Sequence, residues 1–243
     1  MTKEMRKVLI TGAAGQIGRS LRELLAGCYQ FRCLDLKPIS GADDVIIADI
    51  TDFEAVSQAM DGVDGVIHLA SNPDVQQPWE DVYRGGIAGT YNVFEAARRV
   101  GIKQLIYASS NHVSGWREVM GESHITPEMV VRPDSLYGVG KAFGEALAQF
   151  FVDQYGMSII CLRIGSFLPY PNSDRSLKTW CSPRDLAQLV QKSLDHQDLG
   201  FQIFYGVSNN TNRIWNIDNA RQLIDYQPQD NAELNYITDK PNV

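Results

Sequence analysis

The sequence has 243 residues, of which 44% are hydrophobic and 21% charged, as expected for a globular protein with a substantial core. A net charge of −7 without any Lys/Arg run argues against nucleic acid or an anionic membrane as the partner, because either requires a basic face. No apolar stretch reaches the roughly 18 residues of a membrane span, residues 1–6 do not resemble a secretory signal, and the four cysteines lack zinc-binding spacing. We therefore expect a cytoplasmic protein without a metal site.

Short β-branched runs alternate with helical patterns along the chain. We expect strands at 7–11, 31–35, 45–48, 65–70, 103–109 and 158–163, and helices at 16–26, 53–60, 87–100 and 137–155. Continuously apolar strands are typical of a parallel sheet covered on both faces. The alternation predicts one Rossmann-type, doubly wound α/β domain over 1–243. Residues 116–133 are predicted to be a loop, and a small C-terminal substrate-binding cap is expected mainly from about 165–180 and 200–243.

A glycine-rich turn follows the first predicted strand and leads directly into a helix. Its residues are Gly12, Ala13, Ala14, Gly15, Gln16, Ile17 and Gly18. Glycines at this spacing permit a tight turn, let the backbone approach a pyrophosphate and pack the helix against the strand. The helix N-terminus offers N–H groups and the positive end of its dipole to the phosphates. The context predicts dinucleotide binding, the alternative being a glycine-rich turn without a ligand.

Acidic residues end the second and third predicted strands. Asp35 lies where a carboxylate accepts hydrogen bonds from the adenosine ribose hydroxyls and repels a 2′-phosphate, which favours NAD over NADP. Asp49 and Ile50 lie where adenine would bind, although Asp49 could equally be a simple turn residue. We further assign Leu69, Ala70, Ser71 and Ile164 to the cofactor site.

Tyr137 and Lys141 are one helical turn apart and share a helix face. A phenol is a poor base at neutral pH, but an adjacent ammonium and the positive nicotinamide stabilise the phenolate, so we expect a lowered pKa for Tyr137. Ser110 follows the strand before this helix and could hydrogen-bond a substrate oxygen. Tyr137 and Lys141 could also be a chance surface pair, but the glycine turn and Ser110 favour a catalytic role.

Taken together, TGAAGQIG at 11–18, Ser110 and YGVGK at 137–141 resemble the extended short-chain dehydrogenase/reductase superfamily over almost the whole chain. The stretches SSNH (109–112), RPDSLY (132–137), RIGS (163–166) and PNSDR (171–175) are similar to the uronate dehydrogenases. The resemblance implies a catalytic triad of Ser110, Tyr137 and Lys141, which would also contact the cofactor through Tyr137 and Lys141. It further implies substrate contacts from Asn111, His112, Ser166 and Arg175.

Those substrate-side residue types suit a sugar. Asn111 and His112 offer neutral hydrogen-bonding groups for hydroxyls, and the fork of Arg175 suits a carboxylate or a phosphate. Without the resemblance, His112 would more simply be a structural histidine and Arg175 a solvated loop charge.

Three features depart from the pattern of the uronate dehydrogenases or the superfamily. SNPD at 71–74 replaces a Gly-Gly-x-Ser stretch that reaches the substrate, which leaves the sugar open. Gly86 stands at a helix entry where Asn is usual, and Gly140 precedes the catalytic Lys where Ser or Thr is commoner. Both lie near the helix pair that family members use for dimerisation, and we expect them to weaken those helices locally.

We expect NAD-dependent oxidation of a sugar at C1 to a lactone, with an aldohexuronate such as glucuronate or galacturonate as substrate, in a homo-oligomer. The main alternative is a dehydrogenase of a phosphorylated sugar such as glucose 6-phosphate, which Ala70-Ser-Asn-Pro and RPDSLYG also resemble. A nucleotide-sugar epimerase or dehydratase is less favoured, because those relatives have longer C-terminal domains. From a different class, a non-catalytic NAD(P)-binding regulatory protein is disfavoured by the intact Ser110, Tyr137 and Lys141.

Overall fold

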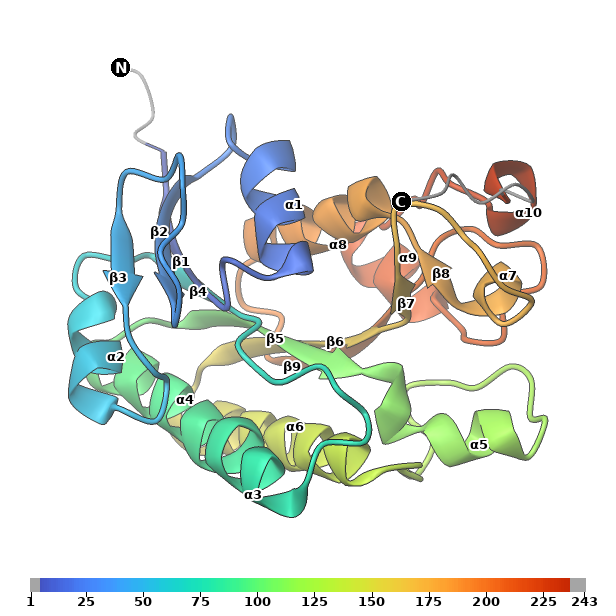
Figure 1. Ribbon diagram of the computed structural model, residues 1–243, viewed down its shortest axis with the longest axis horizontal. Coiled ribbons are helices and arrows are strands. Elements are labelled where there is room, and N and C mark those ends of the chain that lie inside the picture. The colour runs from blue at the N-terminus through green and yellow to red at the C-terminus, as the bar shows by residue number, and fades with distance from the viewer. Residues whose placement is uncertain (1–4, 237–243) are drawn as a thin grey trace.

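Seven parallel strands form the central sheet in the computed structural model, which describes residues 5–236 (Figure 1). The strands are β1 (Lys7–Thr11), β2 (Gln30–Asp35), β3 (Val45–Ile47), β4 (Gly65–His68), β5 (Gln104–Ser110), β6 (Ser158–Ile164) and β9 (Phe201–Gly206). Their order is β3-β2-β1-β4-β5-β6-β9, so the chain runs outward from β1 in one direction and then in the other. The predicted doubly wound Rossmann-type fold is confirmed, and the six predicted strands match within three residues at each end.

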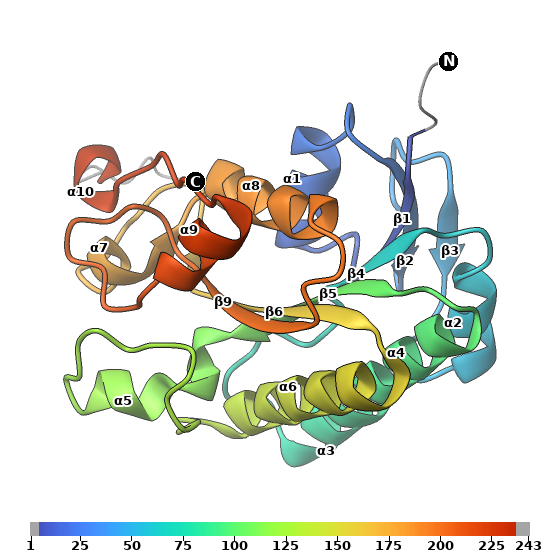
Figure 2. The same ribbon diagram turned by 180° about the vertical axis from the view of Figure 1, so that it is seen from behind.

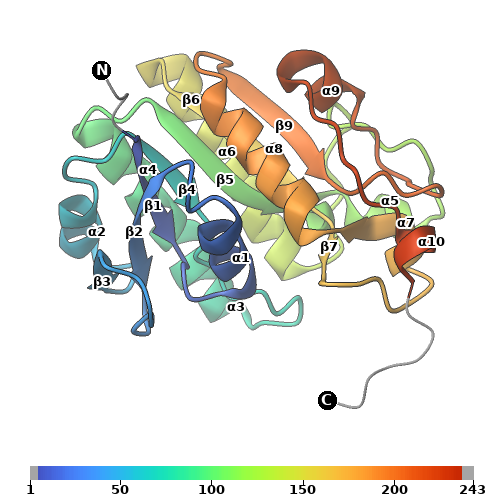
Figure 3. The ribbon, with the colours of Figure 1, turned by 90° about the horizontal axis from the view of Figure 1, so that it is seen from above.

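Two helical layers cover the sheet, as Figures 2 and 3 show from behind and from above. One layer contains α1 (Gln16–Leu24), α8 (Pro183–Asp195) and α9 (Asp218–Ile224); the other contains α2 (Phe53–Ala59), α4 (Thr90–Arg99) and α6 (Leu136–Tyr155). Side chains alternate between the layers: Val8 and Ile10 pack toward the first, and Leu9 toward the second. The central strands β1, β4, β5 and β6 are thus buried on both faces, which explains their largely apolar character.

Local signals fix the ends of these helices. The side chains of Asp52, Ser135 and Ser182 accept hydrogen bonds from backbone N–H groups in the first turns of α2, α6 and α8. Gly156 ends α6 in the left-handed conformation, with φ 61°. The Ser135 cap therefore fixes the first turn of α6, in which Tyr137 lies.

Three segments differ from the sequence prediction. The predicted loop at 116–133 begins with a helix, α5 (Gly115–Val119). The helix predicted at 87–100 is preceded by α3 (Trp79–Asp81) and a π-helix, η1 (Val82–Gly89), before α4 begins. The cap is predicted to come mainly from about 165–180 and 200–243, but within the second range β9 belongs to the central sheet and α9 packs on its face, and 237–243 lie outside the described residues.

The remaining short elements lie beyond the carboxyl ends of β5, β6 and β9, on the right in Figure 1. They are η2 (Asn111–Val113), α5, β7 (Ser166–Phe167), α7 (Ser176–Thr179), β8 (Trp180–Cys181) and α10 (Ala232–Asn235). β7 pairs with β8, α7 contacts α10, and Ile125 bridges to Trp215. Between residues 5 and 236, no helix is long and apolar enough to cross a membrane.

Candidate active site

The glycine turn connects β1 to α1 and requires glycine at two of its positions. Gly12 has φ +73°, and a Cβ there would lie 2.7 Å from the backbone nitrogen of Ala70. A Cβ on Gly18 would lie 2.7 Å from Cα of Ala13. Gly15 caps α1 without a side-chain hydrogen bond, so the N-terminal end of this helix presents backbone N–H groups to the adjacent cavity.

Asp35 lies at the end of β2 and holds the glycine turn as well as facing the cavity. Its Oδ2 accepts a hydrogen bond from the backbone N–H of Ala14 at 2.8 Å, and its Oδ1 accepts one from Lys37 at 3.2 Å. Asp49 accepts a hydrogen bond from the N–H of Thr51 at 2.9 Å, the local turn that was its alternative interpretation. Both carboxylates thus have a structural partner and also line the cavity.

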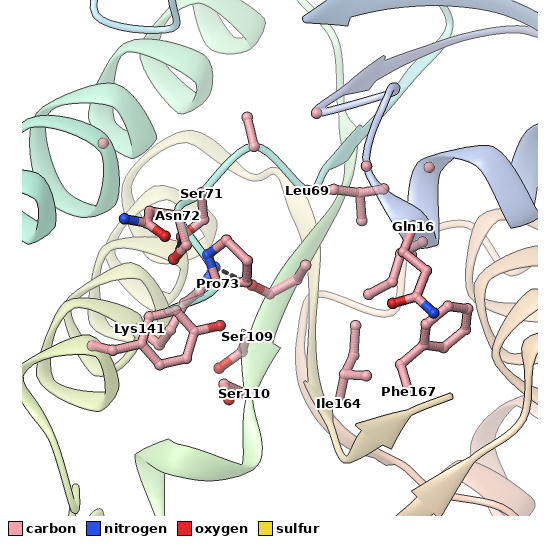
Figure 4. A pocket seen from close by; sticks show the side chains of 18 of the residues that line it. Gln16, Leu69, Ser71, Asn72, Pro73, Ser109, Ser110, Lys141, Ile164 and Phe167 are labelled. Carbon is pink, nitrogen blue, oxygen red and sulfur yellow. Dashed lines mark hydrogen bonds between the residues drawn. The ribbon is translucent and has the colours of Figure 1, made fainter. Parts of the chain in front are cut away.

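A cavity of about 940 Å³ runs from this turn across the carboxyl ends of the strands. Every residue that the sequence assigned to the cofactor, to catalysis or to the substrate lines this cavity, from the glycine turn to Arg175. Figure 4 shows Gln16 and Phe167 on one side, and Lys141 with the segment from Ser71 to Pro73 on the other. Sequence reasoning missed Asp81, Arg84 and Phe167, which also line the cavity but carry no motif.

Tyr137 and Lys141 lie on α6 and face Ser110 at the end of β5. Lys141 is 5% exposed, and its Nζ donates a 2.7 Å hydrogen bond to the carbonyl of Ala108. The same Nζ lies 5.6 Å from the centre of the Tyr137 ring. Burial lowers the pKa of Lys141 to about 8. The ammonium therefore lies beside the phenol at neutral pH, held in place by a backbone carbonyl.

The protein environment of Tyr137 by itself acts against the lowered pKa that the sequence predicts. Burial raises the pKa of Tyr137 above its usual value, and a hydrogen bond with Ser110 lowers it only in part. Desolvation disfavours the phenolate more than nearby groups stabilise it. The lowered pKa expected from the sequence therefore depends on the positive charge of the nicotinamide as well as on Lys141.

A buried ion pair joins α6, the helix that carries Tyr137 and Lys141, to β6. Arg163 donates from Nε and Nη2 to the two carboxylate oxygens of Glu145, at 2.9 and 2.8 Å. Glu145 also accepts a hydrogen bond from the hydroxyl of Ser109, next to Ser110, at 2.5 Å. The pair is 1% and 5% exposed, so it connects the strands and the helix that carry Ser110 and Lys141 without access to water.

The part of the cavity that is predicted to bind the substrate is lined by residues of η2 and β7 and by Arg175, which precedes α7. Nδ1 of His112 lies 2.9 Å from the carboxylate of Asp134, which fixes the orientation of the imidazole. The ring of His112 packs edge-on against that of Tyr137, with ring centres 5.9 Å apart. Asp134, which sequence reasoning did not assign, belongs to the RPDSLY stretch and acts here as the partner of His112.

Arg175 makes contacts on both edges of its guanidinium. Nε and Nη2 donate to the two oxygens of Glu118 in α5, at 2.7 and 2.9 Å, and Nη1 donates to Oγ of Ser166 at 3.0 Å. With its amide oriented to satisfy both neighbours, Asn111 accepts from Nη2 of Arg175 at 2.8 Å and donates to the carbonyl of Ile164 at 3.0 Å. Three of the predicted substrate residues thus converge, and Glu118 is a partner that the sequence did not reveal.

The three departures from the family pattern have distinct structural outcomes. In the 71–74 segment, Asn72 accepts from the N–H of Asp74 at 3.0 Å, which forms a compact turn at the cavity wall. Gly86 lies within the π-helix η1, where the regular α-helix is lost. Gly140 does not interrupt α6; a Cβ there would lie 2.8 Å from Val82, so glycine allows η1 to approach closely.

The fold and the cavity are those of a dinucleotide-dependent Rossmann-type enzyme, and Tyr137 and Lys141 line the cavity. The profile of the NAD dependent epimerase/dehydratase family matches residues 8–176, and the chain belongs to this family. The predicted membership of the extended short-chain dehydrogenase/reductases and the predicted NAD cofactor are thereby confirmed at the level of the family.

Individual relatives match almost the whole chain. An NAD-dependent glucose-6-phosphate dehydrogenase of Haloferax volcanii is 36% identical over 93% of this chain and 94% of its own. A uronate dehydrogenase of Pseudomonas putida is 38% identical over 96% of this chain and 87% of its own. A crystal structure of a uronate dehydrogenase mutant from Agrobacterium tumefaciens complexed with NAD is 36% identical, with a TM-score of 0.86 over 95% of this chain and 87% of that chain. The predicted similarity to uronate dehydrogenases is confirmed.

Proposed function

We propose that this protein oxidises an aldohexuronate, such as glucuronate or galacturonate, at C1 to a lactone, with NAD as the oxidant. The observation that carries the proposal is one continuous cavity that joins the glycine turn, the Ser110–Tyr137–Lys141 group and Arg175. A C1 dehydrogenase of an anionic sugar requires this spatial order along its site: a place for the cofactor, then a proton-transfer group, then a cation.

The residues of the cofactor end fit a dinucleotide. The absence of a Cβ at Gly12, the N-terminus of α1 and the Asp35 carboxylate at the end of β2 suit a pyrophosphate and a ribose without a 2′-phosphate. When bound, NAD accepts the hydride that leaves C1. Gly12, Gly15 and Gly18 would hold its phosphates, and Asp35 its adenosine ribose.

Proton transfer falls to the group on α6 and β5. The hydroxyl of Tyr137, once deprotonated, takes the proton of the anomeric hydroxyl while the C1–H bond breaks, so that a carbonyl forms and the lactone results. The Lys141 ammonium stabilises the phenolate, and it is held by the carbonyl of Ala108. Ser110, adjacent to the Glu145-bound Ser109, hydrogen-bonds the reacting oxygen.

The far end of the sugar site contains Arg175, Asn111 and Ser166, which suit a carboxylate and its neighbouring hydroxyls. A phosphorylated sugar such as glucose 6-phosphate is the second candidate, favoured by the name of the relative from Haloferax volcanii. At this end of the cavity the charge of Arg175 is already balanced by Glu118. This balance favours the uronate.

The test is NAD reduction, followed by absorbance at saturating cofactor, with glucuronate, galacturonate, glucose 6-phosphate and unmodified glucose. We expect turnover with a uronate and a loss of turnover in Tyr137→Phe, which keeps the ring but removes the proton acceptor. Absence of NAD reduction with all four sugars would refute the proposal and favour a regulatory NAD-binding role.

Homo-oligomerisation and a cytoplasmic location are part of the same proposal. Exposed aromatic side chains on α3, η1, α4 and α6, namely Trp79, Tyr83, Tyr91 and Phe150, support self-association through these helices. All four cysteines are free thiols and three of them are buried, which supports a reducing compartment. Light scattering coupled to gel filtration tests the oligomer, and a monomer at micromolar concentration would contradict it.

A further inference from the structure

The guanidinium of Arg175 is held by one edge from behind the cavity. Its Nε/Nη2 edge forms a two-point ion pair with Glu118, with N–O distances of 2.7 and 2.9 Å. Arg175 lines the cavity but Glu118 does not, so the carboxylate contacts the guanidinium from outside the sugar site. Glu118 is 24% exposed, which leaves its charge only partly screened by water.

The adjacent Nη1/Nη2 edge of the same guanidinium contacts two residues that line the cavity, Ser166 and Asn111. Nη1 donates to Ser166 at 3.0 Å, and Nη2 donates to Asn111 at 2.8 Å. A guanidinium has five N–H groups, so this edge can exchange these two neutral partners for an anion without breaking the Glu118 pair. The edge available to a substrate is therefore fixed in direction by Glu118.

The charge of Arg175 is balanced before any sugar binds. The +1 charge of Arg175 is matched by Glu118, and the nearby His112 faces the Asp134 carboxylate. The pair of Arg175 and Glu118 together with a bound group of one negative charge has a total charge of about −1, whereas the same pair with a phosphate dianion has about −2, with the added charge near the Glu118 carboxylate.

We propose that Glu118 is a positioning residue that determines the charge of the accepted sugar: by holding Arg175 from behind, it makes the site favour a carboxylate over a phosphate dianion. This inference rests on the proposed sugar-binding role of the cavity. Glu118 acts only through Arg175 and does not take part in the chemistry.

The test compares Glu118→Gln with the wild type at pH 8, where glucuronate carries one charge and glucose 6-phosphate two. The amide keeps the shape and one acceptor but removes the charge. We expect the ratio of kcat/KM for glucose 6-phosphate to that for glucuronate to rise about tenfold, mainly through KM. Glu122→Gln is the matched control, because Glu122 pairs with Arg117 on the same segment and does not line the cavity; its ratio should equal that of the wild type.

Measuring the affinity for each sugar distinguishes the proposed role of Glu118 from the proposed reaction. Dissociation constants for both sugars are measured by calorimetry in the Tyr137→Phe background with NAD, with and without Glu118→Gln. If the wild type oxidises neither sugar but the affinity ratio still shifts tenfold toward the phosphate, the proposed reaction is wrong and the role of Glu118 holds. A ratio within twofold of the wild type in Glu118→Gln and in Glu118→Ala, or a wild type that prefers glucose 6-phosphate, would overturn the inference.

Discussion

Arg175 offers the sharpest test of what the distal end of the site recognises. Replacing it with Ala removes a charge-assisted, two-point contact with the sugar anion, which contributes about 1.5–3 kcal/mol in proteins. Because the side chain is 44% exposed, we take the lower part of that range, about 1.5–2 kcal/mol. This corresponds to a loss of about 10- to 30-fold in kcat/KM for a uronate.

The structure adds a complication, because Arg175→Ala also leaves Glu118 without its partner behind the sugar site. The double variant Arg175→Ala/Glu118→Gln removes that repulsion and isolates the lost contact. The assay is NAD reduction with glucuronate and with glucose, its neutral counterpart. We expect the double variant to lose activity with glucuronate while its activity with glucose stays within about threefold of the wild type. Arg175→Lys should recover only part of the activity, because an ammonium cannot form the fork. Equal losses for both sugars would show that Arg175 is structural.

Three further predictions concern the cofactor and the catalytic pair. Asp35→Asn should keep an acceptor for the N–H of Ala14 but lower the NAD/NADP ratio of kcat/KM at least tenfold, and a wild type that uses both cofactors equally would contradict the role of Asp35. Burial raises the pKa of Tyr137, so in a pH titration without NAD the tyrosinate absorbance that the wild type has and Tyr137→Phe lacks should appear with a midpoint above pH 10. Turnover in Tyr137→Phe should fall by about 10²–10⁴-fold. Burial lowers the pKa of Lys141 from 10.5 to about 8, so between these pH values the unfolded chain binds more protons than the folded one, and Lys141 makes stability rise with pH. Lys141→Met should therefore be more stable than the wild type by about 2 kcal/mol at pH 7.5, and this difference should close by pH 10.5. Denaturant unfolding of both proteins at the two pH values measures it.

The half of the fold that binds the cofactor follows directly from the sequence. Strands β1, β3 and β4 are short, largely apolar runs, and the glycine turn stands between a strand and a helix, as a dinucleotide-binding turn does. The seventh strand was missed because FQIFYG at 201–206 mixes polar and apolar residues, as suits a strand at the edge of the sheet. The helix α8 could have been found, because Ser182 and Pro183 form a standard helix start before an amphipathic stretch.

The candidate site was predictable where motifs exist and not where partners come from distant segments. Glu118 and Arg175 are 57 residues apart, and nothing near either residue in the chain indicates the pair. The direction of the Tyr137 pKa shift depends on how far the phenol is desolvated, which spacing along a helix does not reveal. The contrast between Gly86 and Gly140 likewise depends on what lies opposite each residue.

The Glu145–Arg163 pair restricts how this enzyme can change through mutation. Removing one partner leaves a buried charge uncompensated, which typically costs about 3–5 kcal/mol, a large part of the stability of a domain. A route by single substitutions therefore passes through a barely folded intermediate, although an apolar pair could replace both residues together. Mutant libraries aimed at new sugars should hold these two positions fixed or vary them jointly. The surface-exposed Arg175–Glu118 pair carries no such constraint, so sugar preference can change more readily than the geometry of the catalytic residues.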